Sequence, residues 1–276
     1  GRGAFFVLRI NTIAMRHFAA LLSATILTAT PAFAEDAPVT GSAQQAEAKA
    51  LDFQRVFASP SLNGAVPRGV KLSPDGRWLT VLRNRADDRE RYDLWGFDRK
   101  SGQWTMLVDS LKLGSGKELS EAEKMQRERQ RIGDLKGIVT YEWTADSKAI
   151  LVPLDGDLYL AGLDGKVSRL TDSAGDELNP ALSPKGGYVS FVRDQRLWAG
   201  KVGAEAKPVS PEEKADTVHW GEAEFVAQEE MARFTGYWWA PDDSRIAVQR
   251  FDDAPVGIVT RAAIGAEGTK TFQQRY

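Results

Sequence analysis

Short apolar stretches, broken at intervals by turn-forming residues, dominate the chain from about residue 51 onward. Four of these breaks share one pattern, a leucine or tryptophan followed by a four-residue turn and a new apolar run, at residues 72–78, 143–148, 182–188 and 239–245. Proline presets φ for the first central position of such a turn, and Asp, Asn or Gly tolerates the next. Further hairpin tips are expected at residues 155–157 and 163–166. Because sustained helical periodicity is scarce, the pattern predicts an all-β chain of repeated hairpins.

The spacing of the repeated turns indicates an architecture. From Ala145 to Pro184 the interval is 39 residues, which fits one propeller blade of roughly 40 to 50 residues. The intervals of 71 residues from Pro74 to Ala145 and of 57 from Pro184 to Pro241 fit a blade that carries an insertion. The chain has room for about five plain blades, or four with two insertions. Since it ends in the strand-like run TKTFQQRY, we expect a partial β-propeller cut from a larger ring.

The first insertion, residues 117–137, is predicted to be helical because residues 120–123, Ser-Glu-Ala-Glu, form a capping-box pattern. Three arginines crowd its second half, at Arg127, Arg129 and Arg131. Taken alone, these residues favour a solvated helix in which Glu123 pairs with Arg127 four positions on, a contact that stabilises a helix by only a few tenths of a kcal/mol.

The second insertion, residues 221–236, places two adjacent carboxylates, Glu229 and Glu230, among apolar residues. Its simplest interpretation is an amphipathic turn of helix in which Glu229 pairs with Arg233. Neighbouring side chains on a regular helix point about 100° apart, so joint use of both glutamates would need a helix end or a distortion.

Composition narrows the function classes. The chain has 276 residues, a net charge of -2 and no cysteine. The charge balance gives no reason to expect a nucleic-acid partner, and thiol catalysis, disulfides and cysteine-ligated metals are excluded. Because no metal-ligand cluster or phosphate-binding glycine loop stands out, we expect neither a metal nor a cofactor.

The N-terminal region predicts export. Residues 15–34 combine a short basic start, an apolar stretch of about 13 residues and an A-x-A site, which is typical of a signal peptide cleaved after Ala34. Residues 1–14 precede a plausible start methionine and are interpreted as non-native, and residues 35–50 read as a polar linker. We therefore expect a periplasmic or extracellular protein whose folded part is residues 51–276.

Two segments carry a resemblance to a known family. EFVAQEEMARFTGYWWAPDDSRIAVQRFDD resembles the double-glutamate segment of dipeptidyl peptidase IV and its relatives, and RERQRIGDLKGIVTYEWTADS resembles the arginine-bearing insertion of bacterial members. The resemblance runs from about Leu51 to Tyr276. It implies an eight-bladed N-terminal propeller followed by a C-terminal α/β-hydrolase domain, as in the prolyl oligopeptidase clan.

By that resemblance, Glu229 and Glu230 would hold the protonated N-terminus of a substrate peptide. An arginine of the first insertion would hold a substrate carbonyl, with Arg127 the first choice and Arg129 and Arg131 its rivals. A homodimer is left open as the assembly.

No catalytic residue is expected in the chain itself. A G-x-S-x-G nucleophile elbow is absent, and His219 is the single histidine after the predicted cleavage site, so no Ser-Asp-His triad can be assembled. We expect the recognition propeller of an exported serine exopeptidase that removes dipeptides, without its hydrolase domain. The alternative is a non-enzymatic exported propeller that binds peptides or proteins.

Overall fold

The structure is a computed structural model that describes residues 51–58, 62 and 64–275. The predicted signal peptide, the residues before it and the linker lie outside the described residues. No helix within the described ranges is long and apolar enough to span a membrane.

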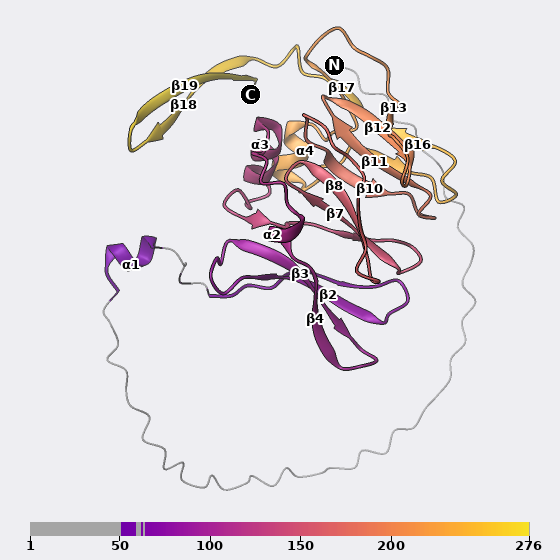
Figure 1. Ribbon diagram of the computed structural model, residues 1–276. Coiled ribbons are helices and arrows are strands. Elements are labelled where there is room, and N and C mark those ends of the chain that lie inside the picture. Colours follow the sequence, from indigo (N-terminus) through magenta and orange to yellow (C-terminus); the bar gives the residue numbers. More distant parts are fainter. Residues whose placement is uncertain (1–50, 59–61, 63, 276) are drawn as a thin grey trace, which may run out of the picture. The chain divides into compact units, whose positions relative to one another are not determined.

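Three four-stranded antiparallel meanders follow one another along the chain (Figure 1). The first consists of β1 (Arg68–Leu72), β2 (Trp78–Asn84), β3 (Arg91–Asp98) and β4 (Gln103–Val108), and the two-residue β5 (Lys136–Gly137) adds to β3 in parallel. The second consists of β6 (Glu142–Trp143), β7 (Ala149–Leu154), β8 (Asp157–Gly162) and β9 (Val167–Arg169). The third consists of β10 (Leu178–Leu182), β11 (Tyr188–Arg193), β12 (Arg196–Lys201) and β13 (Lys207–Pro208).

A fourth sheet is begun after them. β14 (Val218–Trp220) and β15 (Tyr237–Trp239) both pair with one stretch of chain, made of β17 (Arg250–Asp252) and β16 (Ile246–Val248). A long hairpin of β18 (Ile258–Gly265) and β19 (Gly268–Arg275) then projects away from the sheets (Figure 1). The helices are short, namely α1 (Phe53–Phe57), α2 (Ser110–Leu113), α3 (Glu121–Arg129) and α4 (Phe225–Glu230).

The four predicted turns fold alike. In each, the N–H of the first turn residue donates to the carbonyl of the residue five positions later, and the N–H three positions later donates back to the first residue. The position that closes each turn has a left-handed φ, which glycine adopts at no steric cost. These positions are Gly76 (70°), Ser147 (60°), Gly186 (75°) and Asp243 (64°). The repeated-hairpin prediction is therefore confirmed.

Apolar clusters join each sheet to the next. Leu82 and Leu94 of the first sheet pack with Ile150 and Val152 of the second. A second cluster joins the second sheet to the third, and a third cluster joins the third sheet to the fourth. Successive meanders that pack face against face are the architecture of a β-propeller, so the predicted fold class, a partial all-β propeller, is confirmed.

Buried hydroxyl groups reinforce two of the three interfaces. Trp143 Nε1 in the second sheet donates to Thr80 Oγ1 in the first at 3.0 Å, and Tyr141 Oη, just before β6, lies 2.9 Å from the same atom. The fourth sheet repeats this arrangement on the third, because Trp239 Nε1 donates to Ser190 Oγ at 2.8 Å and Tyr237 Oη lies 3.3 Å from the same atom. We call these two contacts the hydroxyl clamps.

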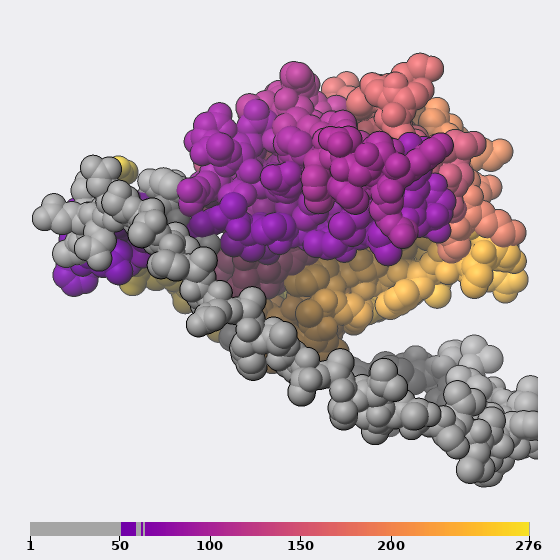
Figure 2. All heavy atoms as spheres, turned by 90° about the horizontal axis from the view of Figure 1, so that it is seen from below, coloured from indigo at the N-terminus to yellow at the C-terminus, as the bar shows by residue number. Residues whose placement is uncertain are grey.

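The remaining interface, between the second and third sheets, has Leu151 and Leu182 at the positions that correspond to the clamp residues, and Glu142 accepts there from the Leu182 N–H at 2.9 Å. The first sheet presents its own corresponding positions, Val70 and Leu72, to solvent, with exposed fractions of 62% and 59%. Residues of this sheet, indigo and purple, form a continuous part of the surface in Figure 2.

Candidate functional site

The second insertion leaves the fourth sheet and returns to it between two glycines. Gly236 N donates to Gly221 O at 2.8 Å, Gly221 N donates to Gln249 O at 3.0 Å, and Gln249 N donates to Gly236 O at 2.7 Å. β14 and β15 therefore act as one strand interrupted by residues 221–236. The bounds predicted for this insertion match the residues that leave the sheet.

Within the insertion, α4 ends directly after the two glutamates. Glu224 caps its start by accepting from the N–H groups of Val226 and Ala227. Met231 is the C-cap, and Ala232 has a left-handed φ of 49° that stops the helix. Glu229 and Glu230 thus occupy a helix end, the condition under which neighbouring side chains can serve one ligand. The helix end itself carries partial negative charge from its free carbonyls, and the last turn contains no basic residue, so a cation is favoured there.

The first insertion forms α3 as predicted, with Ser120 at the N-cap accepting from Glu123 N at 3.2 Å. Arg127 is buried in this helix, where its Nε lies 2.7 Å from Glu123 Oε1 and its Nη1 donates to Leu135 O at 3.3 Å. The expected pair between Glu123 and Arg127 is formed. Both contacts tie Arg127 to its own insertion.

Arg129 instead reaches across to α4, which lies beside α3 (Figure 1). Its Nη1 donates to Gln228 Oε1 at 2.8 Å, its Nε lies 3.6 Å from Glu229 Oε1, and its guanidinium lies over the Phe225 ring. Arg131 Nη2 is 3.8 Å from Glu229 Oε2. The structure therefore brings two of the three candidate arginines to the glutamates.

Arg233, the helical partner expected for Glu229, makes other contacts. Its Nη1 donates to Thr235 O at 3.0 Å and to Gln249 Oε1 at 2.9 Å. These bonds brace the return of the insertion to the sheet.

A pocket of about 420 Å³ lies between α3, α4 and the hairpin. Both glutamates and two of the arginines face it, whereas Arg127 does not line it. Among the described residues, no ion pair involves Glu230, so its carboxylate is available to a ligand. The ten lining residues are Met125, Glu128, Arg129, Arg131, Phe225, Glu229, Glu230, Arg261, Phe272 and Gln274.

Sequence reasoning missed Gln228, although it organises this site. Its side chain is buried, its Nε2 donates to Ala223 O at 2.6 Å, and its Oε1 accepts from Arg129. It therefore links the two helices beside Glu229. Its adjacency to the two acids was the only available signal, since an amide side chain carries no charge pattern.

His219 lies near the base of the second insertion and has two partners. Its Nδ1 is 3.1 Å from Glu222 Oε2, and its ring stacks on Phe251 with the centroids 4.6 Å apart. No group of three or more His, Asp or Glu side chains in the described part of the chain could hold a metal ion.

The sheets and the two-helix pocket define the class of protein, a partial β-propeller whose insertions form a pocket lined by acids and arginines. Residues 144–276 match the family described as dipeptidyl peptidase IV N-terminal region. The comparisons support a dipeptidyl peptidase IV family N-terminal propeller region, with the family match covering residues 144–276.

Individual relatives agree with this assignment. The chain is 27% identical to human dipeptidyl peptidase 8 over 169 residues, which cover 51% of this chain and 18% of that protein. It is 28% identical to mouse dipeptidyl peptidase 8 over 150 residues, which cover 46% of this chain and 16% of that protein. The crystal structure of Porphyromonas gingivalis dipeptidyl peptidase 4 has the same fold, with a TM-score of 0.51 and 22% identity, over 76% of this chain and 29% of that one. The chain thus spans less than a third of these relatives.

Proposed function

We propose that this chain is the substrate-recognition propeller of an exported serine exopeptidase that removes dipeptides from the free N-termini of peptides. What supports the proposal is the placement of Glu229 and Glu230 together at the end of α4, in a pocket that Arg129 enters from the other insertion. In this proposal the catalytic triad belongs to a hydrolase domain outside residues 1–276, and export depends on residues 15–34.

The chemistry of a peptide N-terminus suits this pocket. An α-amine has a pKa near about 8 and is largely cationic at neutral pH. Two neighbouring carboxylates repel each other, and a shared ammonium group relieves that repulsion. The carbonyls at the end of α4 add attraction for the cation. Anchoring the amine at a fixed place makes the enzyme measure two residues from the N-terminus to the bond that is cut.

Arg129 is the arginine we propose for the substrate carbonyl. Gln228, Glu229 and Phe225 hold its guanidinium beside the glutamates, so little side-chain entropy remains to be lost when a substrate binds. Arg131 is the second choice, because it faces the same pocket but is more exposed. Arg127 already uses its Nε and Nη1 within its own insertion.

Titration calorimetry on the full chain tests the proposal. The probe is a tetrapeptide with a free N-terminus and proline in second place, and its N-acetylated form is the matched ligand. We expect Glu229→Gln and Glu230→Gln each to weaken binding by at least about tenfold, or about 1.4 kcal/mol, because each removes one charge from the ammonium site. The acetylated peptide should bind weakly to every form of the protein.

Glu121→Gln is the control variant, because this glutamate is exposed on α3, pairs with Lys124 and does not line the pocket. Unchanged binding by both pocket variants would refute the proposal. Equal binding of the free and acetylated peptides would instead support the alternative, a module that binds peptides without reading their N-termini.

A further inference from the structure

Gln228 of α4 lies beside a cation and an acid that are held in different ways. Arg129 Nη1 donates to Gln228 Oε1 at 2.8 Å, whereas Arg129 Nε stays 3.6 Å from Glu229 Oε1. The first distance is that of a hydrogen bond, and the second is longer than one. A neutral amide therefore holds the guanidinium next to a carboxylate on which it does not close.

Other arginines of the chain do close on their acids. Arg127 Nε lies 2.7 Å from Glu123 Oε1, and Arg85 Nη1 lies 2.8 Å from Asp93 Oδ2. Pairs of ionised groups normally approach this closely, because the charges strengthen the hydrogen bond. The longer separation beside Gln228 therefore has a physical cause, which is the competing bond to the amide oxygen.

The amide of Gln228 has one orientation, because both of its ends are engaged. Its Nε2 donates to Ala223 O at 2.6 Å, and a carbonyl can only accept, so the amide oxygen must face Arg129. Ala223 is fully buried, and its N–H donates to Phe234 O at 3.1 Å. A chain of hydrogen bonds thus runs from the base of the second insertion to the guanidinium.

The helix itself does not depend on this side chain. The backbone N–H of Gln228 donates to Glu224 O at 3.1 Å, and the Glu224 side chain caps the start of α4. Burying an amide costs free energy unless its polar atoms are hydrogen-bonded. Here the amide spends its two hydrogen bonds on fixing an arginine of the other insertion.

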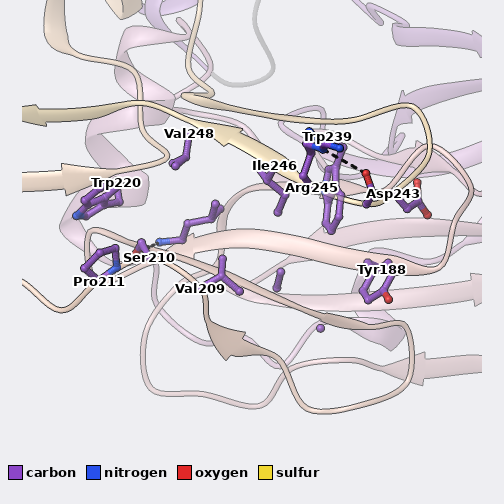
Figure 3. Close-up of a pocket in the computed structure, with 14 residues that line it drawn as sticks. Tyr188, Val209, Ser210, Pro211, Trp220, Trp239, Asp243, Arg245, Ile246 and Val248 are labelled. Atoms are coloured by element: carbon purple, nitrogen blue, oxygen red, sulfur yellow. Dashed lines mark hydrogen bonds between the residues drawn. The ribbon is translucent and has the colours of Figure 1, made fainter.

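The cleft between the third sheet and β16 offers a comparison, since Arg245 and Asp243 both line it (Figure 3). There the acid accepts from Ser183 Oγ at 2.6 Å and from Lys185 N at 2.9 Å, so both of its oxygens serve the turn. The contacts of Glu229 with arginines are 3.6 and 3.8 Å long. Its oxygens are thus much more open to a ligand than those of the acid in the cleft.

We infer that Gln228 is a positioning residue, which holds Arg129 apart from Glu229 so that the carboxylate stays open to an ammonium group. This inference rests on the proposed function. Without the amide, the guanidinium can close on Glu229, and the ammonium group of a peptide must then compete with it for the same oxygens. A neutral acceptor anchors the arginine in the pocket without neutralising the acid.

Calorimetry on the full chain, with the free-N-terminus tetrapeptide as the probe, tests the inference. Gln228→Met keeps the length of the side chain and removes both hydrogen bonds, so we expect binding to weaken by about tenfold or more. When Arg129→Met is added, no guanidinium remains at residue 129 to close on Glu229. We therefore expect the double variant to bind the peptide at least about threefold more tightly than Gln228→Met alone.

A purely structural role predicts the opposite order, since the double variant would lose more contacts and bind no better than Gln228→Met. Arg245→Met is the control, because this exposed arginine lines the other cleft, and it should not restore binding to Gln228→Met. Gln228→Asn is the second variant, because its shorter amide cannot reach both Ala223 O and Arg129. It should show the same weakening and the same rescue, and it carries the test if circular dichroism shows that Gln228→Met is unfolded.

Failure of this inference can be distinguished from failure of the proposed function. If Glu230→Gln weakens peptide binding but the double variant binds no more tightly than Gln228→Met, the positioning role is wrong and the ammonium site stands. If both Glu229→Gln and Glu230→Gln leave binding unchanged, the proposed function is wrong, and this inference falls with it.

Discussion

At the residue scale, tertiary contacts decide which of several similar side chains takes part in a site. The adjacent acids Glu229 and Glu230 were visible in the sequence because two neighbouring carboxylates among apolar residues are conspicuous. The sequence did not show which arginine would reach these acids. That choice depends on the helix end, since α3 ends at Arg129 and Arg131 follows in a left-handed conformation, with φ of 58°. Only the packing of α3 beside α4 distinguishes Arg129 from Arg127.

A half-buried carboxyl on β6 makes stability depend on pH. Burial raises the pKa of Glu142, while the Leu182 N–H at 2.9 Å and the charge of Lys71 partly oppose that shift. A raised folded-state pKa means that this carboxyl contributes stability below its ordinary value of 4.5 and loses that contribution as the pH rises through the raised value. Glu142→Gln keeps an acceptor for Leu182 and removes the titration.

We therefore expect the Glu142→Gln variant to become more stable relative to the natural protein as the pH rises from about 4.5 to 7. Urea unfolding at a series of pH values measures this difference. A difference in unfolding free energy that stays flat over that range would contradict the assignment.

At the element scale, the second insertion depends on two glycines that let the chain leave and re-enter one strand. The sequence indicated its bounds because Gly221 and Gly236 flank a segment that lacks the strand pattern. It could not indicate that β14 and β15 form one interrupted strand, since that pairing depends on Gln249 across the sheet. A Cβ atom on Gly236 would lie 2.0 Å from Glu222 O.

Gly236→Ala should therefore destabilise the protein by about 2 kcal/mol or more, because the backbone of the closure must shift. It should also weaken peptide binding, since α4 loses its fixed base. Thermal unfolding and calorimetry measure the two effects. Gly257→Ala is the control, because nothing lies within 4 Å of its added Cβ, and a similar loss in both variants would argue against a steric cause.

At the scale of the whole molecule, the sheets are joined by alternating chemistry. Hydroxyl clamps join the first sheet to the second and the third to the fourth, while Leu151 and Leu182 serve the interface between. The repeated turns allowed the propeller to be predicted from sequence. The clamps could not be predicted from sequence, because the tryptophan and its hydroxyl partner are 63 residues apart in one clamp and 49 in the other. A single threonine or serine in a strand does not indicate such a distant contact.

Thr80→Val tests the first clamp. Valine has nearly the shape of threonine but cannot accept from Trp143 Nε1, whereas Tyr141 Oη keeps its bond to Gly69 O. We expect a loss of about 1–3 kcal/mol in the free energy of unfolding, the cost of a buried donor without a partner. Thr80→Ser should retain most of the stability, because Ser190 performs the same role in the second clamp. Equal losses from valine and serine in urea unfolding would assign the effect to packing instead.

The alternation of clamps and leucines also constrains how the chain can misfold. A sheet that docked one place out of order would press tyrosine and tryptophan donors against leucine, and would leave a buried threonine or serine facing an aliphatic side chain. Such a mismatch costs free energy at any of these interfaces, because a buried polar group is left without a hydrogen-bond partner. Side-chain chemistry therefore disfavours docking one place out of order, in addition to the connections between the sheets.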